Sequence, residues 1–221
     1  MIRIRLPDGS ERTVVRGTRL REAARTLQPE LADLAVCAEV GGALRDLRDR
    51  LEEDCRMTLL TAAAPEGARV VRHTAAHVVA QAARRLFPAA TLGRDPIAEN
   101  LFQYDLEIGR ALTEDDLERI QVEVDRIIAE DLPIERDSLS KGEARTWLIR
   151  RGEVLKLEIL ERIDAPTVTV YSHGEFSDLC SGPHLQSTGR LPGIRLTSVE
   201  ETTWQNDPGG ERLLRFCGTF A

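Results

Sequence analysis

An alternation of apolar and charged residues at the start of the chain sets the first strong limit on its fold. Ile2, Ile4 and Leu6 alternate with arginines, and the turn-forming segment Pro7-Asp8-Gly9-Ser10 follows at once. A second alternating run then extends to Val15. Two such runs joined by a turn of this composition predict an antiparallel hairpin with one buried face.

A helix and further short strands are expected directly after this hairpin. Leu20, Ala23 and Leu27 share one helical face, and residues 34–40 and 56–61 have the composition of strands. The order strand, strand, helix, strand, strand within so short a segment indicates a small β-grasp, ubiquitin-like domain.

The remaining chain is predicted to form a larger domain that mixes helices and strands. Residues 62–67, Ala-Ala-Ala-Pro-Glu-Gly, lack periodicity, so we place a β-grasp domain over 1–64 and a second domain over 65–221. Helices are expected at the start of the second domain, after a cap at Thr113 and after a cap at Ser140, and mostly strands are expected from Leu155 onward. The predicted fold class is α+β.

Composition places the chain among globular proteins and shows no general nucleic-acid surface. Of 221 residues, 42% are hydrophobic and 30% charged, which excludes disordered and collagenous classes. No apolar run approaches the roughly 18 residues of a membrane span, and the start lacks a signal peptide's apolar core, so we expect a cytoplasmic protein without a membrane partner. Because the net charge is -7, any RNA contact would have to be local.

Two short motifs bring together residues that can do chemistry. His73 and His77 are spaced by four on a predicted helix and therefore share a face. Cys180 and His184 flank a Gly-Pro turn that can bring them together. The three imidazoles and the thiol are also donors of a tetrahedral zinc site. Either motif alone is as compatible with buried structural side chains as with a functional site.

These motifs resemble the HxxxH and CxxxH signature of the editing domain shared by threonyl- and alanyl-tRNA synthetases. Residues 6–10 and the β-grasp pattern resemble the TGS domain that begins threonyl-tRNA synthetases, and residues 152–160, 171–184 and 213–220 match the same branch. The resemblance covers the whole chain. No ATP-binding motif is recognisable in this sequence. The resemblance therefore implies an editing activity without aminoacylation, in a fragment of a synthetase or in a free-standing editing factor.

The resemblance implies hydrolysis of mischarged Ser-tRNA(Thr), because a pocket that accepts threonine cannot strongly exclude the smaller serine. His73 would relay a proton and sterically disfavour the extra methyl of threonine. Lys156 would orient water, and Asp178 would hold the substrate amino group. The implied catalytic set is His73, His77, Lys156, Asp178, Cys180 and His184.

Substrate contacts and partners also follow from the resemblance. The partner would be the 3′ end of tRNA(Thr) carrying serine, together with the rest of the synthetase if the chain is a fragment. The chain departs from the family at Leu101, Gln103 and Gln205, positions that bear on terminal-adenosine binding. The substrate-binding set is Tyr104, Asp178, Trp204 and Asp207.

Several readings stay open on sequence alone. No cofactor is expected, although zinc is possible at the four His and Cys positions. Cys180 could instead be the nucleophile of a Cys-His thiol hydrolase, or the chain could be a non-catalytic, zinc-stabilised RNA-binding module. Lys156, one of only two lysines, could be a surface residue of a strand. For the editing function we expect His73 and Lys156 to face a cleft, so that their replacement spares the fold.

Overall fold

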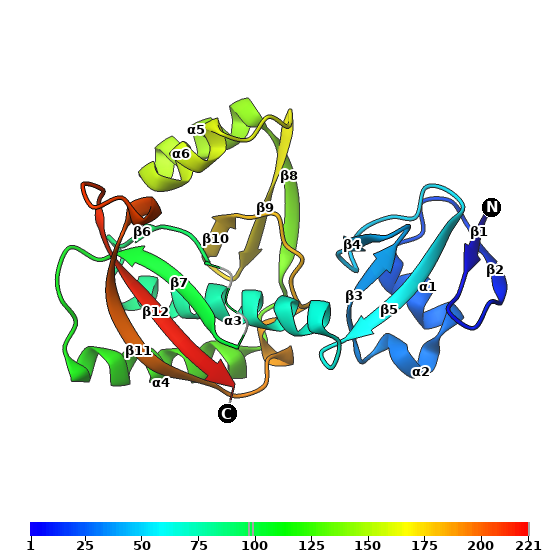
Figure 1. Cartoon of the computed structure of the whole chain (residues 1–221), viewed down its shortest axis with the longest axis horizontal. Helices are drawn as coiled ribbons and strands as arrows, with labels where there is room; N and C mark the ends of the chain where they lie inside the picture. The colour runs from blue at the N-terminus through cyan, green and yellow to red at the C-terminus, as the bar shows by residue number, and fades with distance from the viewer. Residues whose placement is uncertain (97, 99, 221) are drawn as a thin grey trace. The chain divides into compact units, whose positions relative to one another are not determined.

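The computed structural model describes residues 1–96, 98 and 100–220 and divides into two compact units (Figure 1). The first contains residues 1–71 and the segment 182–185, and the second contains residues 72–181 and 186–220. The division falls within the long helix α3 (Pro65–Leu86), and the predicted domain boundary lies immediately before this helix.

The first unit is the mixed sheet and helix that the sequence predicts. The hairpin is confirmed: β1 and β2 pair antiparallel with Ile2 opposite Val14, and Gly9 adopts a φ of 82° in the turn. Strand β5 pairs parallel to β1 and antiparallel to β3, in the order β2-β1-β5-β3-β4. The elements are β1 (Ile2–Arg5), β2 (Glu11–Val14), α1 (Leu20–Leu27), α2 (Pro29–Ala32), β3 (Ala35–Val40), β4 (Ala43–Arg45) and β5 (Cys55–Thr61).

The core of the first unit lies between α1 and one face of this sheet. Ile4, Leu20 and Met57 are among its fully buried side chains. The alternating residues of β1 point into this core while Arg3 and Arg5 remain exposed, as the pattern of the sequence requires.

The second unit combines helices with two antiparallel sheets. The three-stranded sheet has the order β10-β9-β8, and the four-stranded sheet has the order β11-β12-β7-β6. The strands are β6 (Thr91–Leu92), β7 (Phe102–Glu107), β8 (Glu135–Ser140), β9 (Thr167–His173), β10 (Phe176–Leu179), β11 (Ile194–Thr203) and β12 (Arg212–Phe220). The helices that follow α3 are α4 (Glu114–Glu130), α5 (Lys141–Arg151), α6 (Val154–Glu161) and the short 3-10 turns η1 (Thr188–Arg190) and η2 (Trp204–Asn206).

Local sequence signals explain where two of these helices begin. Thr113 caps α4 by accepting a hydrogen bond from the backbone of Asp116, whose carboxylate in turn accepts from the backbone of Thr113. Ser140 and Glu143 form the same reciprocal cap on α5. Together, the helices and antiparallel sheets of the second unit and the β-grasp arrangement of the first confirm the predicted α+β fold class.

The alternative reading of Lys156 as a surface residue of a strand is wrong, and the strands expected from Leu155 onward begin only after a helix. The segment Val154–Glu161 forms α6, and the Lys156 side chain is buried. Helices α5 and α6 pack on the three-stranded sheet through Leu148 and Leu160, and Leu155 packs against Trp204. This packing on two sides carries the intervening Lys156 into the interior.

None of the helices in the described part of the chain combines the length and apolarity that a membrane crossing requires.

Candidate active site

Helix α3 brings the first two predicted residues together. His73 and His77 lie one turn apart, with ring centroids 5.0 Å apart and ring planes nearly perpendicular. The His77 side chain is only 1% exposed, whereas His73 is 16% exposed and is reached by solvent. The pair therefore has an inner and an outer member.

The end of β10 brings Cys180 to the outer histidine. The backbone of Cys180 donates a hydrogen bond to Thr169 on β9, which continues the pairing of β9 and β10. Cys180 Sγ lies 3.1 Å from His73 Nε2. Two residues separated by about a hundred positions in the sequence are thus in direct contact, as the paired motifs indicated.

Lys156 and Asp178 form a buried ion pair beside the histidines. Lys156 Nζ lies 2.8 Å and 2.9 Å from the two carboxylate oxygens, and the Tyr104 hydroxyl donates to Oδ2 at 2.6 Å. Burial disfavours the charged amine, but the adjacent Asp178 outweighs it and raises the pKa of Lys156. Lys156 therefore stays an ammonium inside the protein.

Asp95 is a site residue that the sequence analysis missed. Its Oδ2 lies 2.9 Å from His73 Nε2, and its side chain is 34% exposed. It stands alone in the segment between β6 and β7, where no spacing or motif marks it. Only the folded arrangement of this segment against α3 reveals it.

The two histidines of α3 are held in different charge states. Burial lowers the pKa of His73, but its contacts with Cys180 and Asp95 raise it well above its ordinary value. Burial and the neighbouring His73 lower the pKa of His77 well below its ordinary value. A cationic imidazole therefore adjoins a neutral one, a separation typical of sites that transfer protons.

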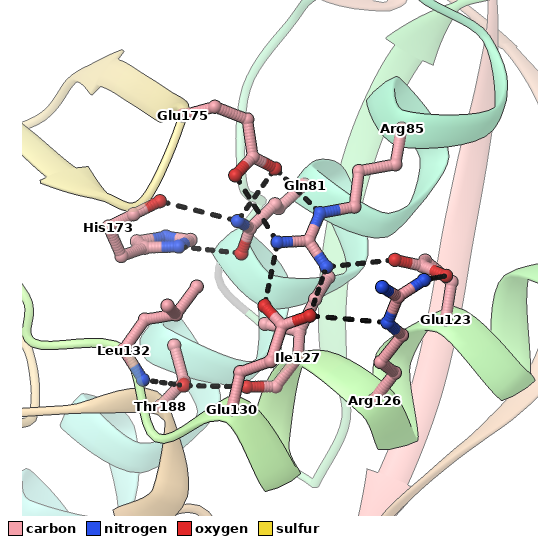
Figure 2. A network of polar contacts seen from close by, with 10 residues as sticks. All are labelled: Gln81, Arg85, Glu123, Arg126, Ile127, Glu130, Leu132, His173, Glu175 and Thr188. Atoms are coloured by element: carbon pink, nitrogen blue, oxygen red, sulfur yellow. Dashed lines mark hydrogen bonds and ion pairs between the residues drawn. The ribbon is translucent and has the colours of Figure 1, made fainter.

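A polar network anchors the hairpin between β9 and β10 to α3 (Figure 2). Gln81 follows His77 by one turn, and its Oε1 lies 2.8 Å from His173 Nδ1 while its amide nitrogen donates to Glu175 at 3.0 Å. Arg85, one turn further, binds Glu175 and also Glu130 of α4. Burial lowers the pKa of His173 to about 4, so its ring is neutral. The network fixes the strand that carries Asp178 relative to the helix that carries the histidines.

The other predicted residues occupy different surroundings. Tyr104 is fully buried, Trp204 donates from its indole nitrogen to Glu158 at 2.7 Å, and Asp207 is exposed and accepts from the Gly209 backbone. Substrate contact by these three residues stays a prediction. His184 lies in the segment 182–185 of the first unit, where its backbone nitrogen donates to an Asp46 oxygen at 3.3 Å.

The donor types present are suitable for a metal. His73, His77, Cys180 and His184 make a set that could hold a zinc ion, since zinc takes imidazole nitrogen and thiolate sulfur. The buried Lys156 ammonium, paired with Asp178 beside His77, opposes a dication.

The family comparisons agree with this arrangement. Residues 2–61 match the TGS domain family, and residues 168–212 match the family described as the threonyl and alanyl tRNA synthetase second additional domain. The chain thus combines a TGS domain with a match to the second additional domain of threonyl and alanyl tRNA synthetases.

Curated relatives narrow the class. The chain is 42% identical over 220 residues to a threonine–tRNA ligase of Symbiobacterium thermophilum and 44% identical over 221 residues to one of Thermotoga neapolitana. It is 41% identical to threonine–tRNA ligase 2 of Bacillus subtilis. These matches cover 98–99% of the chain but 34% of each relative, so the chain spans about a third of their length. Its homologues are therefore threonyl-tRNA synthetases, and the chain matches their TGS and second additional domains.

Proposed function

We propose that this chain hydrolyses the ester of mischarged Ser-tRNA(Thr). The observation that supports it most is the buried Lys156–Asp178 pair next to the contact between His73 and Cys180, in a chain that matches an editing-domain family. Two cationic donors of fixed position are what an ester hydrolase needs to stabilise the developing oxyanion and to protonate the leaving group.

The proposed reaction is attack of water on the seryl carbonyl. Lys156 provides positive charge where the oxyanion develops, as a point donor. The cationic His73 gives its proton to the ribose oxygen as the carbon–oxygen bond breaks, and it is reprotonated by the attacking water. The products are serine and a free tRNA end, so protons balance without any other reactant.

The proposed function predicts that the chain hydrolyses the seryl ester in preference to the threonyl ester, which carries one more methyl group. We expect Ser-tRNA(Thr) to lose its ester about 10- to 200-fold faster than Thr-tRNA(Thr), because in this proposal His73 sterically disfavours the extra methyl group of threonine. Single-turnover deacylation of each ester by this chain measures the ratio. Equal rates, or no hydrolysis of either ester, would contradict the proposal.

A thiol mechanism is the second candidate, and one observation favours it. The distance of 3.1 Å between Cys180 Sγ and His73 Nε2 is that of a nucleophile and its base. This mechanism requires a thioester to serine, which acid quenching would trap. Cys180→Ala would then abolish hydrolysis, whereas the water mechanism predicts residual activity and no trapped acyl group.

Zinc chemistry would need the four His and Cys side chains as ligands. A bound zinc ion supplies a polarising charge and lowers the pKa of a bound water, but only if one coordination position is left open. Four protein ligands would fill every position of a tetrahedral site. Such a site would stabilise the fold, which corresponds to the RNA-binding alternative.

We therefore propose that hydrolysis is metal-free. The chain is expected to retain its rate after exhaustive chelation, because the Lys156 ammonium takes the electrostatic role of a metal and repels a dication. Elemental analysis and deacylation before and after chelation provide the measurement. Stoichiometric zinc, with activity lost on chelation and restored by zinc, would overturn the prediction.

The same function implies the partners. The substrate would be the 3′ end of tRNA(Thr) carrying serine, and the relatives' remaining length implies association with the rest of a synthetase. A cytoplasmic location stays the expectation from the sequence.

A further inference from the structure

An amino-acid ester carries an α-ammonium group, and a site that binds it needs a negatively charged acceptor. Two carboxylates that touch candidate catalytic side chains are those of Asp178 and Asp95. The following inference rests on the proposed function and concerns which of the two meets that group.

Asp178 is already engaged on both of its oxygens. Lys156 contacts both oxygens, the Tyr104 hydroxyl occupies Oδ2, and the Asp178 side chain is only 1% exposed. A second ammonium arriving there would lie against the Lys156 ammonium and be repelled by it. The position of Asp178 therefore suits it to hold Lys156.

Asp95, in contrast to Asp178, is partly exposed and makes few contacts. Its side chain is 34% exposed, and the single contact of its carboxylate among the described residues is the one from Oδ2 to His73. Its place is well defined, because the preceding Arg94 accepts a hydrogen bond from the Asp105 backbone and Gly93 donates one to Asp105. The Asp95 carboxylate is thus partly open to solvent and lies directly beside His73.

We propose that Asp95 receives the α-ammonium group of the aminoacyl ester. It orients the ester so that its carbonyl side lies beside His73, and it makes a free amino group a requirement for binding. Esters whose amino group is acylated, such as those of peptidyl or formylated amino acids, are consequently poor ligands.

Two adenosine amides test this directly. One carries serine through a 3′-amide that is resistant to hydrolysis, and the other carries 2,3-dihydroxypropanoate, in which a hydroxyl replaces the ammonium. Their dissociation constants are measured by calorimetry at about pH 6.5, below the pKa of an α-amino group. We expect Asp95→Asn to weaken the seryl amide about 10- to 100-fold and the hydroxy amide less than about 3-fold, because a hydrogen bond to a charged group is lost only with the first.

Two variants serve as controls. Asp95→Glu restores part of the preference for the seryl amide, because the charge is retained. Asp137→Asn, the same change at an exposed carboxylate of β8, leaves both affinities unchanged. Thermal unfolding of each variant shows that the fold is intact.

Two results would overturn the proposal. If Asp95→Asn weakens both amides equally, Asp95 acts only by holding His73. If Asp178→Asn removes the preference while Asp95→Asn keeps it, the amino group binds at Asp178. Failure of the unaltered chain to bind either amide would contradict the proposed function itself and remove the basis of this inference with it.

Discussion

Replacing Lys156 with methionine is expected to lower both the stability of the chain and its hydrolytic rate. The side chain is 2% exposed and neutralises Asp178, which is 1% exposed. Removing one partner of a buried ion pair costs about 3–5 kcal/mol in the free energy of unfolding, because the other charge stays buried without compensation. The deacylation rate should fall on the order of 100- to 10,000-fold, the size of a positioned charge or proton donor.

Denaturant unfolding and single-turnover deacylation of Ser-tRNA(Thr) measure the two effects separately. The double variant Lys156→Met/Asp178→Asn should regain most of the stability, because no charge is left unpaired, but it should not regain the rate. Lys141→Met, a change of the other lysine, which bonds to the Ile163 carbonyl, should keep the rate. Unchanged stability of Lys156→Met would contradict the buried pair, and an unchanged rate would contradict the role of Lys156 in hydrolysis.

Replacing His73 with alanine is expected to affect the rate alone. His73 is the outer, cationic member of the histidine pair and contacts Asp95 and Cys180. The rate of seryl-ester hydrolysis should fall on the order of 100- to 10,000-fold, because the leaving ribose oxygen loses its proton donor. The free energy of unfolding should change little, because alanine favours the helix and the lost contacts are partly exposed.

A control variant on the same helix tests whether any substitution on α3 lowers the deacylation rate or only the substitution of His73. Glu66→Ala changes an exposed residue in the first turn of α3 and should leave the deacylation rate unaltered. Unfolding of His73→Ala would show that the histidine is structural, and a full rate in this variant would exclude it from catalysis.

The structure contradicts one prediction about these two residues. The sequence predicts that His73 and Lys156 both face a cleft, so that either can be replaced without loss of fold. His73 is indeed partly exposed, but Lys156 lies inside, on α6. The segment 154–161 is apolar on most sides, as strands and buried helices both are, so local pattern could not separate the two.

Local patterns were enough for the β-grasp order, the hairpin at Pro7–Ser10, the caps at Thr113 and Ser140, and the shared face of His73 and His77. Each depends on residues a few positions apart, whose geometry is set by backbone periodicity and turn chemistry. The contacts of Lys156 with Asp178, of Tyr104 with Asp178 and of Asp95 with His73 join distant segments and leave no trace in spacing. They arise only when α3, α6 and the two sheets pack together, because burial and charge pairing depend on neighbours in space and not on neighbours in sequence.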